Sequence, residues 1–224
     1  MFKKLFAALG GRPAGQSTQA EGSFDRLGWV APDRNPYGIR LLDCRSLTRI
    51  WPANSENPGV ASQFLRLRKS DGQEHRGKSP APALIIECDL SYPTPAKPLS
   101  DGRLYGSRFM EDKWDAYQWG GCWYFVQSWT GHLVHRVTVA SGPGGTQATQ
   151  VESDAGSLDN DQKLALAEAD FLIKNLIYDW QGPHPMPEGF PQDDLRKIAE
   201  YSFQRYGRRA SFATFEETTS LRVD

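Results

Sequence analysis

The sequence predicts an α+β fold, in which a tryptophan-rich antiparallel β-meander forms a sheet and two C-terminal helices pack on one face of it. Three aromatic or β-branched runs separated by glycine-containing turns lie between residues 113 and 139, a pattern typical of neighbouring antiparallel strands. Two apolar stripes at helical spacing follow after residue 159. Because the strands come first and the helices afterwards, we expect the helices together on one face of the sheet.

The composition is that of a folded chain. The 224 residues are 39% apolar and 24% charged, with seven Trp, eight Tyr and eleven Phe, which is too aromatic for a disordered protein. We expect residues 1–24 to form a flexible or amphipathic N-terminal segment and residues 25–224 to form a single α+β domain. The net charge of −1 argues against nucleic acid as a partner, because general affinity for phosphates needs a positive surplus.

Charge is distributed unevenly along the chain. Basic residues are in excess between residues 34 and 78, and acidic residues are in excess between residues 151 and 200. Two solvated surfaces of opposite sign explain this distribution, and a docking surface for an acidic partner is the alternative.

The N-terminus begins with Lys3 and Lys4 followed by a short apolar stretch. This stretch, residues 5–9, is shorter than the roughly 7 to 15 residues of a secretory signal, so we expect a cytoplasmic protein. A frayed start is the simpler expectation, and a brief amphipathic helix that contacts a membrane or a partner is the alternative. No run of about 18 apolar residues occurs, so no transmembrane segment is expected.

The first predicted strand covers residues 37–44, after a turn at residues 33–36. Residues 46–77 are ambiguous: residues 64–67 fit a short strand or a helical turn, and residues 54–59 look like a loop. Residues 82–90 form a compact apolar run with a β-branched centre, which predicts a buried strand. The prolines that follow within residues 92–98 interrupt the sheet, since proline cannot donate a ladder hydrogen bond.

The meander is the clearest pattern in the chain. Its predicted strands are residues 113–119, 122–129 and 132–139. Gly120 and Gly121 suit the positive φ angles of a tight hairpin turn, and Thr130 with Gly131 permits a second reversal. Both faces of the central strand are largely apolar, so we expect both to be covered. Residues 146–151 are expected to add one more edge strand.

Two helices are predicted from their apolar spacing. The first covers residues 159–180, where Ala169, Leu172, Ile173, Leu176 and Trp180 form a stripe. The second covers residues 192–206, with acidic residues at its start and Gly207 at its stop.

No group of residues matches the spacing of a known catalytic, metal or nucleotide site, so the sequence does not decide whether the chain is an enzyme. The three cysteines are widely separated, which favours reduced thiols in the core and excludes a CxxC metal motif. His132 and His135 are three residues apart on a predicted strand and face opposite ways. No metal and no cofactor are therefore expected.

The candidate binding site combines polar and aromatic residues expected at the open end of the meander. Its members are Arg108, Lys113, Gln127, Ser128, Trp129, Thr130 and Arg136. A Trp ring beside guanidinium groups suits an anionic or planar ligand or a protein loop. The alternative interpretation is that the Trp rings fill a core between the sheet and the helices.

Four short segments resemble a group of uncharacterised bacterial proteins. The segments are NPYGIRLLDCR (residues 35–45), Lys113-Trp114, Tyr124-Phe125 and SWTG (residues 128–131), and the group shares NP-aromatic-G…LDCR and KW…SWTG patterns over roughly residues 35–140. The resemblance implies no activity, cofactor or catalytic residue. Where such proteins have Arg before SWTG, this chain has Gln127, which weakens an anion-binding role there.

Two functions are expected as alternatives. The first is a non-enzymatic binding or protein-interaction module whose partner is another protein or a small anionic ligand, with the Trp129 hairpin end and the basic residues 34–78 as its surface. The second is a small hydrolase or transferase acting on an anionic substrate. Its constellation would be Arg108, Asp112, Ser128 and His135, with Asp112 and His135 as the acid and base candidates.

Overall fold

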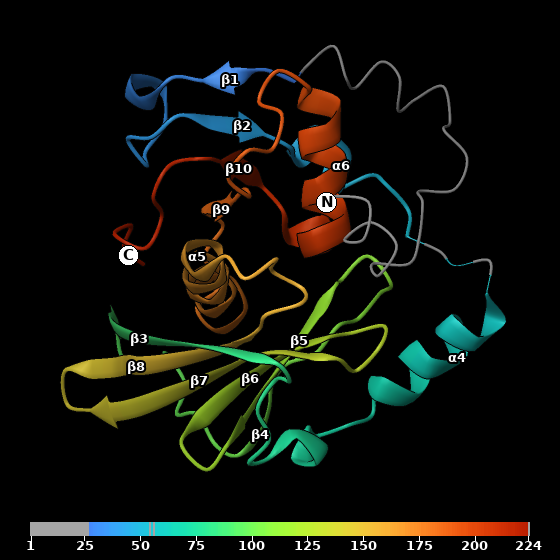
Figure 1. The fold of residues 1–224 in the computed structure, drawn as a ribbon, viewed down its shortest axis with the longest axis vertical. Coiled ribbons are helices and arrows are strands. Elements are labelled where there is room, and N and C mark those ends of the chain that lie inside the picture. The colour runs from blue at the N-terminus through green and yellow to red at the C-terminus, as the bar shows by residue number, and fades with distance from the viewer. Residues whose placement is uncertain (1–26, 54, 56, 224) are drawn as a thin grey trace.

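A computed structural model describes residues 27–53, 55 and 57–223 of the chain (Figure 1). The predicted N-terminal segment, residues 1–24, therefore lies outside the described residues. Among the described residues, no helix has the length and apolar character needed to cross a membrane.

The larger sheet has six antiparallel strands in the order β3-β8-β7-β6-β5-β4. These are β3 (Ala83–Tyr92), β4 (Gly102–Tyr105), β5 (Trp114–Trp119), β6 (Cys122–Gln127), β7 (Leu133–Gly142) and β8 (Gly145–Asp154). The predicted meander is confirmed as β5, β6 and β7, and its first turn has φ angles of 58° at Gly120 and 75° at Gly121. Positive φ at both central residues is the geometry of the tight hairpin turn that the sequence indicated.

A second, four-stranded sheet has the order β1-β2-β10-β9 and was not predicted. Its strands are β1 (Trp29–Val30), β2 (Leu41–Asp43), β9 (Pro183–Pro185) and β10 (Phe212–Thr214). All four are two or three residues long, which is too short to show an alternating pattern in the sequence. The strand expected over residues 37–44 is only β2, because the Asn35 side chain donates to the carbonyls of Ala31 and Ile39, each at 2.8 Å, and holds a loop before it.

The two C-terminal helices are confirmed, and both pack against the six-stranded sheet. Helix α5 (Gln162–Leu172) begins at its N-cap Asp161 and continues as the π-helical turn η3 (Ile173–Ile177). Helix α6 (Leu195–Tyr206) ends at Gly207, which has a φ of 68°. The last turn of α6 reaches the sheet, where the Trp114 indole nitrogen donates to the Arg205 carbonyl at 2.7 Å.

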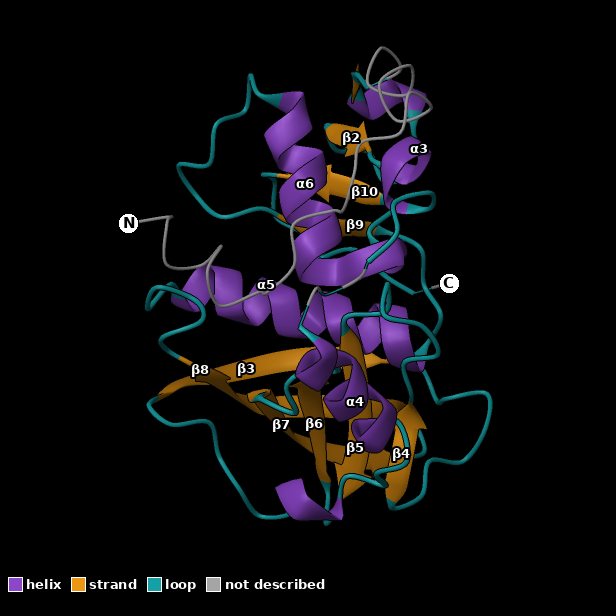
Figure 2. Cartoon of the chain, turned by 90° about the vertical axis from the view of Figure 1, so that its right-hand side faces the viewer, coloured by secondary structure: helices purple, strands orange, loops and turns teal. Residues whose placement is uncertain are grey.

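Helix α5 lies between the two sheets (Figure 1). Turned by 90°, the molecule shows α5 above β3 and β8, with β9 and β10 on the other side of the helix (Figure 2). A helix placed between two layers has almost no solvated face, so even charged residues of α5 such as Glu168 and Asp170 are buried.

The remaining short helices are α3 (Arg45–Thr48), α4 (Pro58–Leu67), η1 (Pro32–Arg34), η2 (Gln73–His75) and η4 (Gly207–Arg209). Helix α4 starts two residues inside the loop expected over residues 54–59, and it decides residues 64–67 in favour of the helical alternative. Asn57 is its N-cap and accepts from the Gly59 amide at 2.9 Å, with Pro58 at the first helical position. That pair is a helix-start signal in the sequence.

Strand β6 is covered on both faces, as predicted. Trp123 and Phe125 belong to the main core under α5, whereas Tyr124 and Val126 belong to a smaller cluster on the opposite face. The segment around η2 covers this second face: the Gly77 amide donates to the Tyr124 hydroxyl at 2.9 Å. The residues predicted as a separate edge strand at 146–151 are part of β8, which lies between β7 and β3.

Candidate functional site

Three polar side chains meet where strand β3 ends against helix α5. Asp170 accepts from the Tyr92 hydroxyl at 2.9 Å through one carboxylate oxygen. Its other oxygen accepts from the Lys174 ammonium at 2.6 Å. Asp170 and Lys174 are one helical turn apart, so α5 and its π-helical turn hold both on one side, while β3 supplies the tyrosine.

A cavity of about 540 Å³ opens beside these three side chains. Its wall includes Asp170, Lys174, the end of β3 (residues 89–92), Gly144 of the β7–β8 turn and residues 219–223 of the C-terminal segment. A cavity of this size holds a small ligand or a few residues of a polypeptide.

The C-terminal segment is held in place by Lys174. The Lys174 ammonium donates to the carbonyls of Thr218 and Thr219, at 3.2 and 3.4 Å. Lys174 lies inside the π-helical turn, and π-turns within α-helices are frequent at functional sites. The chain end lies beside α5, at the left of Figure 1.

The buried negative charge of Asp170 is only partly balanced by Lys174 and Tyr92. Burial raises the pKa of Asp170 to about 6, although Lys174 and the hydrogen bond from Tyr92 act in the opposite direction. A buried carboxylate whose pKa is raised, at the wall of a cavity, is a functional-site candidate with a physical cause.

Strand β3 reaches this cavity with one edge unpaired. It is the terminal strand of its sheet, and among the described residues it pairs only with β8. Along its ten residues exposed and half-buried positions alternate, and Ile85 is 60% exposed. A β-bulge between Glu87 and Leu90 interrupts the register, after which pairing with β8 resumes up to Tyr92. An open edge of this length is a template for another strand.

The turn between β7 and β8 presses against the end of β3. A Cβ atom at Gly145 would stand 2.1 Å from the Tyr92 carbonyl oxygen, and Gly145 has a φ of 123°. Only glycine tolerates both conditions, so this residue fixes the shape of the cavity next to Tyr92.

A second buried polar cluster lies on the same helix and is sealed. Glu168 accepts hydrogen bonds from the Arg205 guanidinium and, at 3.0 Å, from the Tyr206 hydroxyl. It also shares a hydrogen bond with the His135 ring at 2.9 Å. Burial opposes its ionisation, but Arg205 and these hydrogen bonds lower the pKa of Glu168 to about 2. The cluster ties the six-stranded sheet, α5 and α6 together.

Most of the predicted binding residues do come together, around the turn after β6. The Lys113 ammonium lies 3.8 Å from the centre of the Trp129 ring, and the Trp129 indole donates to Met110 at 2.8 Å. Thr130 bonds to Gln127 at 3.3 Å, and Arg108 joins the group through its backbone amide. Trp129 is 8% exposed, so its ring offers little free surface. Burial lowers the pKa of Lys113 to about 8.

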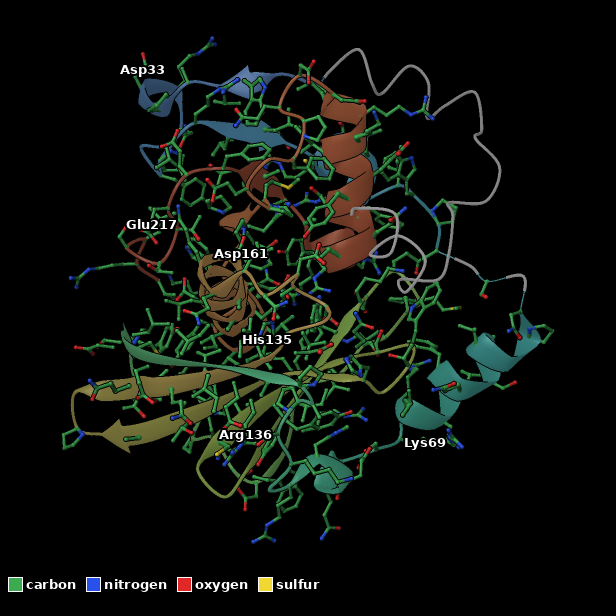
Figure 3. All side chains as sticks on the ribbon, viewed as in Figure 1. Asp33, Lys69, His135, Arg136, Asp161 and Glu217 are labelled. Atoms are coloured by element: carbon green, nitrogen blue, oxygen red, sulfur yellow. The ribbon has the colours of Figure 1, made fainter. Side chains whose placement is uncertain are left out.

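Arg136 does not join them. Side chains alternate along β7, so Arg136 faces the opposite side of the sheet from His135, as Figure 3 shows. There it pairs with Glu152 at 2.5 Å and contacts Cys122.

The alternative catalytic residues occupy two separate networks. Ser128 donates to the Asp112 carbonyl at 2.7 Å, and the Asp112 carboxylate accepts from the Arg108 amide at 2.8 Å. His135 uses both ring nitrogens elsewhere, with Ser153 at 2.8 Å and with Glu168. In the described part of the chain, no hydrogen bond links His135 to Ser128 or Asp112.

The basic residues 34–78 are divided between two ends of the molecule. Arg40 and Arg45 lie by the small sheet, on the Trp29 and Phe212 rings respectively. Arg76 lies over Trp119 near η2, on the far side of the large sheet. Within residues 27–53, 55 and 57–223, no group of three or more His, Cys, Asp or Glu is arranged to hold a metal ion.

Sequence reasoning missed the Asp170 cluster. Its visible signal was an Asp and a Lys four residues apart in a predicted helix, with Asp170 placed between apolar neighbours. Tyr92 and the C-terminal segment join them only through the fold.

No family model, no curated protein and no solved structure matches this chain. The resemblance of residues 35–140 to an uncharacterised bacterial group therefore stays a prediction, and function must be argued from the geometry.

Proposed function

We propose that this protein is a non-enzymatic interaction module that binds an extended polypeptide segment by strand addition to β3. The observation that carries the proposal is that the unpaired edge of a ten-residue strand runs directly into a polar cavity. Strand addition supplies main-chain hydrogen bonds along the edge, and a cavity beside the edge supplies selectivity for a side chain.

At ten residues, β3 is long for a strand whose second edge pairs with no other strand of the described residues. Edge strands are usually short or covered, or carry charges or bulges, because an open edge invites pairing with another chain. Strand β3 has a bulge and two acidic residues, but it is long and no other strand of the described residues covers its edge. Here Ile85 exposes a large apolar side chain in the regular part of β3, before the bulge. Bulges bend a strand and re-aim its side chains, and this one lies at the start of residues 89–92, which line the cavity.

A test uses acetylated, fluorescein-labelled ten-residue peptides with Val at alternate positions and Lys, Gln or Glu at the intervening ones. We expect at least one of the three to bind the full-length protein in a fluorescence anisotropy titration. The best binder is then made in two N-methylated forms, one with methyl groups on the odd residues and one on the even residues. Because alternate amides of a strand point to opposite edges, only one form should lose affinity, by tenfold or more.

Equal affinity of both N-methylated forms would contradict strand addition. Two matched protein variants locate the binding edge: Ile85→Lys on β3 and Leu65→Lys on α4, since Leu65 is similarly exposed at 57%. The first should weaken a lysine-bearing peptide and the second should not. If only the Leu65→Lys variant lost affinity for the peptide, the binding site would lie at α4 and not at β3.

A further inference from the structure

The two faces of β3 specify different side chains on an added strand. One face carries the exposed Glu87 and Asp89. Each uses one carboxylate oxygen to accept from a glutamine of β8 at 2.8 Å, Gln150 for Glu87 and Gln147 for Asp89. Oppositely charged pairs across neighbouring strands stabilise a sheet and like charges destabilise it, so the positions beside Glu87 and Asp89 favour basic side chains, whereas Ile85 on the same face is apolar and 60% exposed.

The other face of β3 is apolar and only partly covered by α5. Its members Leu84, Ile86, Cys88 and Leu90 are all half-buried and pack against the core clusters. An added strand would complete their burial with its own apolar side chains, which removes apolar surface from water. The partner segment therefore alternates apolar and basic residues.

The cavity at the end of β3 adds a third requirement. Each carboxylate oxygen of Asp170 accepts one hydrogen bond from a described residue, whereas a carboxylate offers about four acceptor sites. Its pKa is raised because burial outweighs the help from Lys174 and Tyr92. A further positive charge would complete the compensation.

We propose that the partner is a cationic amphipathic strand, with apolar residues at alternate positions, Lys or Arg between them, and one ammonium group in the cavity beside Asp170. This inference rests on the proposed strand addition. A second copy of the chain is a poorer occupant, because its β3 would bring the same acidic residues, Glu87 and Asp89, into the shared ribbon.

The test compares the Lys, Gln and Glu peptides on wild type and on the double variant Glu87→Lys, Asp89→Lys. Wild type is expected to bind the Lys peptide about tenfold more tightly than the Glu peptide at low salt, with the Gln peptide between them. The double variant should reverse this order. Asp33→Lys with Asp193→Lys is the matched control, because it changes the net charge equally at two exposed residues outside β3, and it should keep the wild-type order.

Equal affinities of the Lys and Glu peptides for wild type would overturn the cationic assignment while leaving strand addition intact. If none of the three peptides binds, the proposed function itself falls. A wild-type dimer in analytical ultracentrifugation that the Lys peptide does not dissociate would assign the edge to a second copy, and would also overturn the proposal.

The cavity is tested with a Lys peptide whose terminal residue is either Lys or norleucine. We expect the terminal Lys to bind wild type several-fold more tightly, and this preference to disappear in Asp170→Asn. Equal affinities of the two peptides for wild type would overturn the placement of an ammonium group beside Asp170. Thermal melts of the variant without peptide verify that it is folded.

Discussion

Glu168 and Asp170 lie two residues apart on α5, and both side chains are almost fully buried, yet their surroundings differ. Glu168 is held by Arg205, His135 and Tyr206 inside a sealed core, and its pKa is lowered to about 2. Asp170 has Lys174 and Tyr92 beside a cavity, and its pKa is raised to about 6.

We interpret this difference as that between a structural charge and a charge available to the proposed partner. A buried carboxylate whose charge is matched by a guanidinium and further donors is a clamp, and losing it leaves an opposite charge unpaired. A buried carboxylate with incomplete compensation and an adjacent cavity keeps capacity for a partner from outside. Its position at the end of the unpaired edge of β3 connects this capacity with strand addition.

The largest expected effect is on the sealed cluster. Glu168→Ala should lower the free energy of unfolding by about 5 kcal/mol, the upper end for breaking a buried ion pair, because Arg205 is left charged and buried. Chemical denaturation at neutral pH measures it. A loss below about 1 kcal/mol would show that the Arg205 charge is relieved by water, and the contrast with Asp170 would fail.

Acid should destabilise the protein through His184, a fully buried histidine of β9 whose ring contacts Tyr206 of the sealed cluster. Burial lowers the pKa of His184 to about 3 from its usual 6.5, so neutral His184 favours folding above the unfolded-state pKa, and this stability is lost as the pH falls towards 3. The loss is about 1.4 kcal/mol for each pH unit in that window.

The matched variant is His184→Phe, since the ring packs against both Phe171 and Tyr206. Its free energy of unfolding, measured by denaturation from pH 7 to 4, should fall less steeply than that of wild type. Parallel curves would mean that His184 does not carry the acid sensitivity.

A smaller effect is expected at the cavity. Asp170→Asn should lower the free energy of unfolding by about 1 to 2 kcal/mol. The loss is small because the Lys174 ammonium keeps two carbonyl acceptors, Thr218 and Thr219, and lies beside the cavity. Denaturation of the two α5 variants side by side tests the contrast. If Asp170→Asn cost as much as Glu168→Ala, the two carboxylates would have the same structural role.

The smallest expected effect is a shift in titration. The Asp170 carboxyl should titrate near pH 6 in ¹³C NMR of the free protein, and binding of the lysine-ended peptide should lower that midpoint by about one unit. An unchanged midpoint at saturating peptide would place the ammonium group elsewhere.

The sequence predicted the fold where local patterns were long. Gly120 and Gly121 between aromatic runs predicted the β5–β6 hairpin, and the apolar stripe from Ala169 to Leu176 predicted α5. The small sheet was missed because strands of two or three residues carry no period. That sheet also covers the side of α5 that points away from the six-stranded sheet, where β9 contacts the helix.

The candidate site was harder to predict than the fold. Asp170 and Lys174 have the spacing of an ordinary surface ion pair on a helix. What distinguishes them is burial and the approach of Tyr92, which is 78 residues away in the sequence. Most residues of the predicted cluster around Trp129 are close together in the sequence. In the structure they contact one another, so the Trp129 ring has little surface left for a ligand.

The most direct test of the central claim is backbone amide exchange along β3, read residue by residue by NMR with and without the Lys peptide. Strand addition predicts that the β3 amides not bonded to β8 exchange quickly in the free protein and become protected at saturation, while amides of β4, the opposite edge, do not change. Unchanged exchange along β3 at saturating peptide would contradict the account.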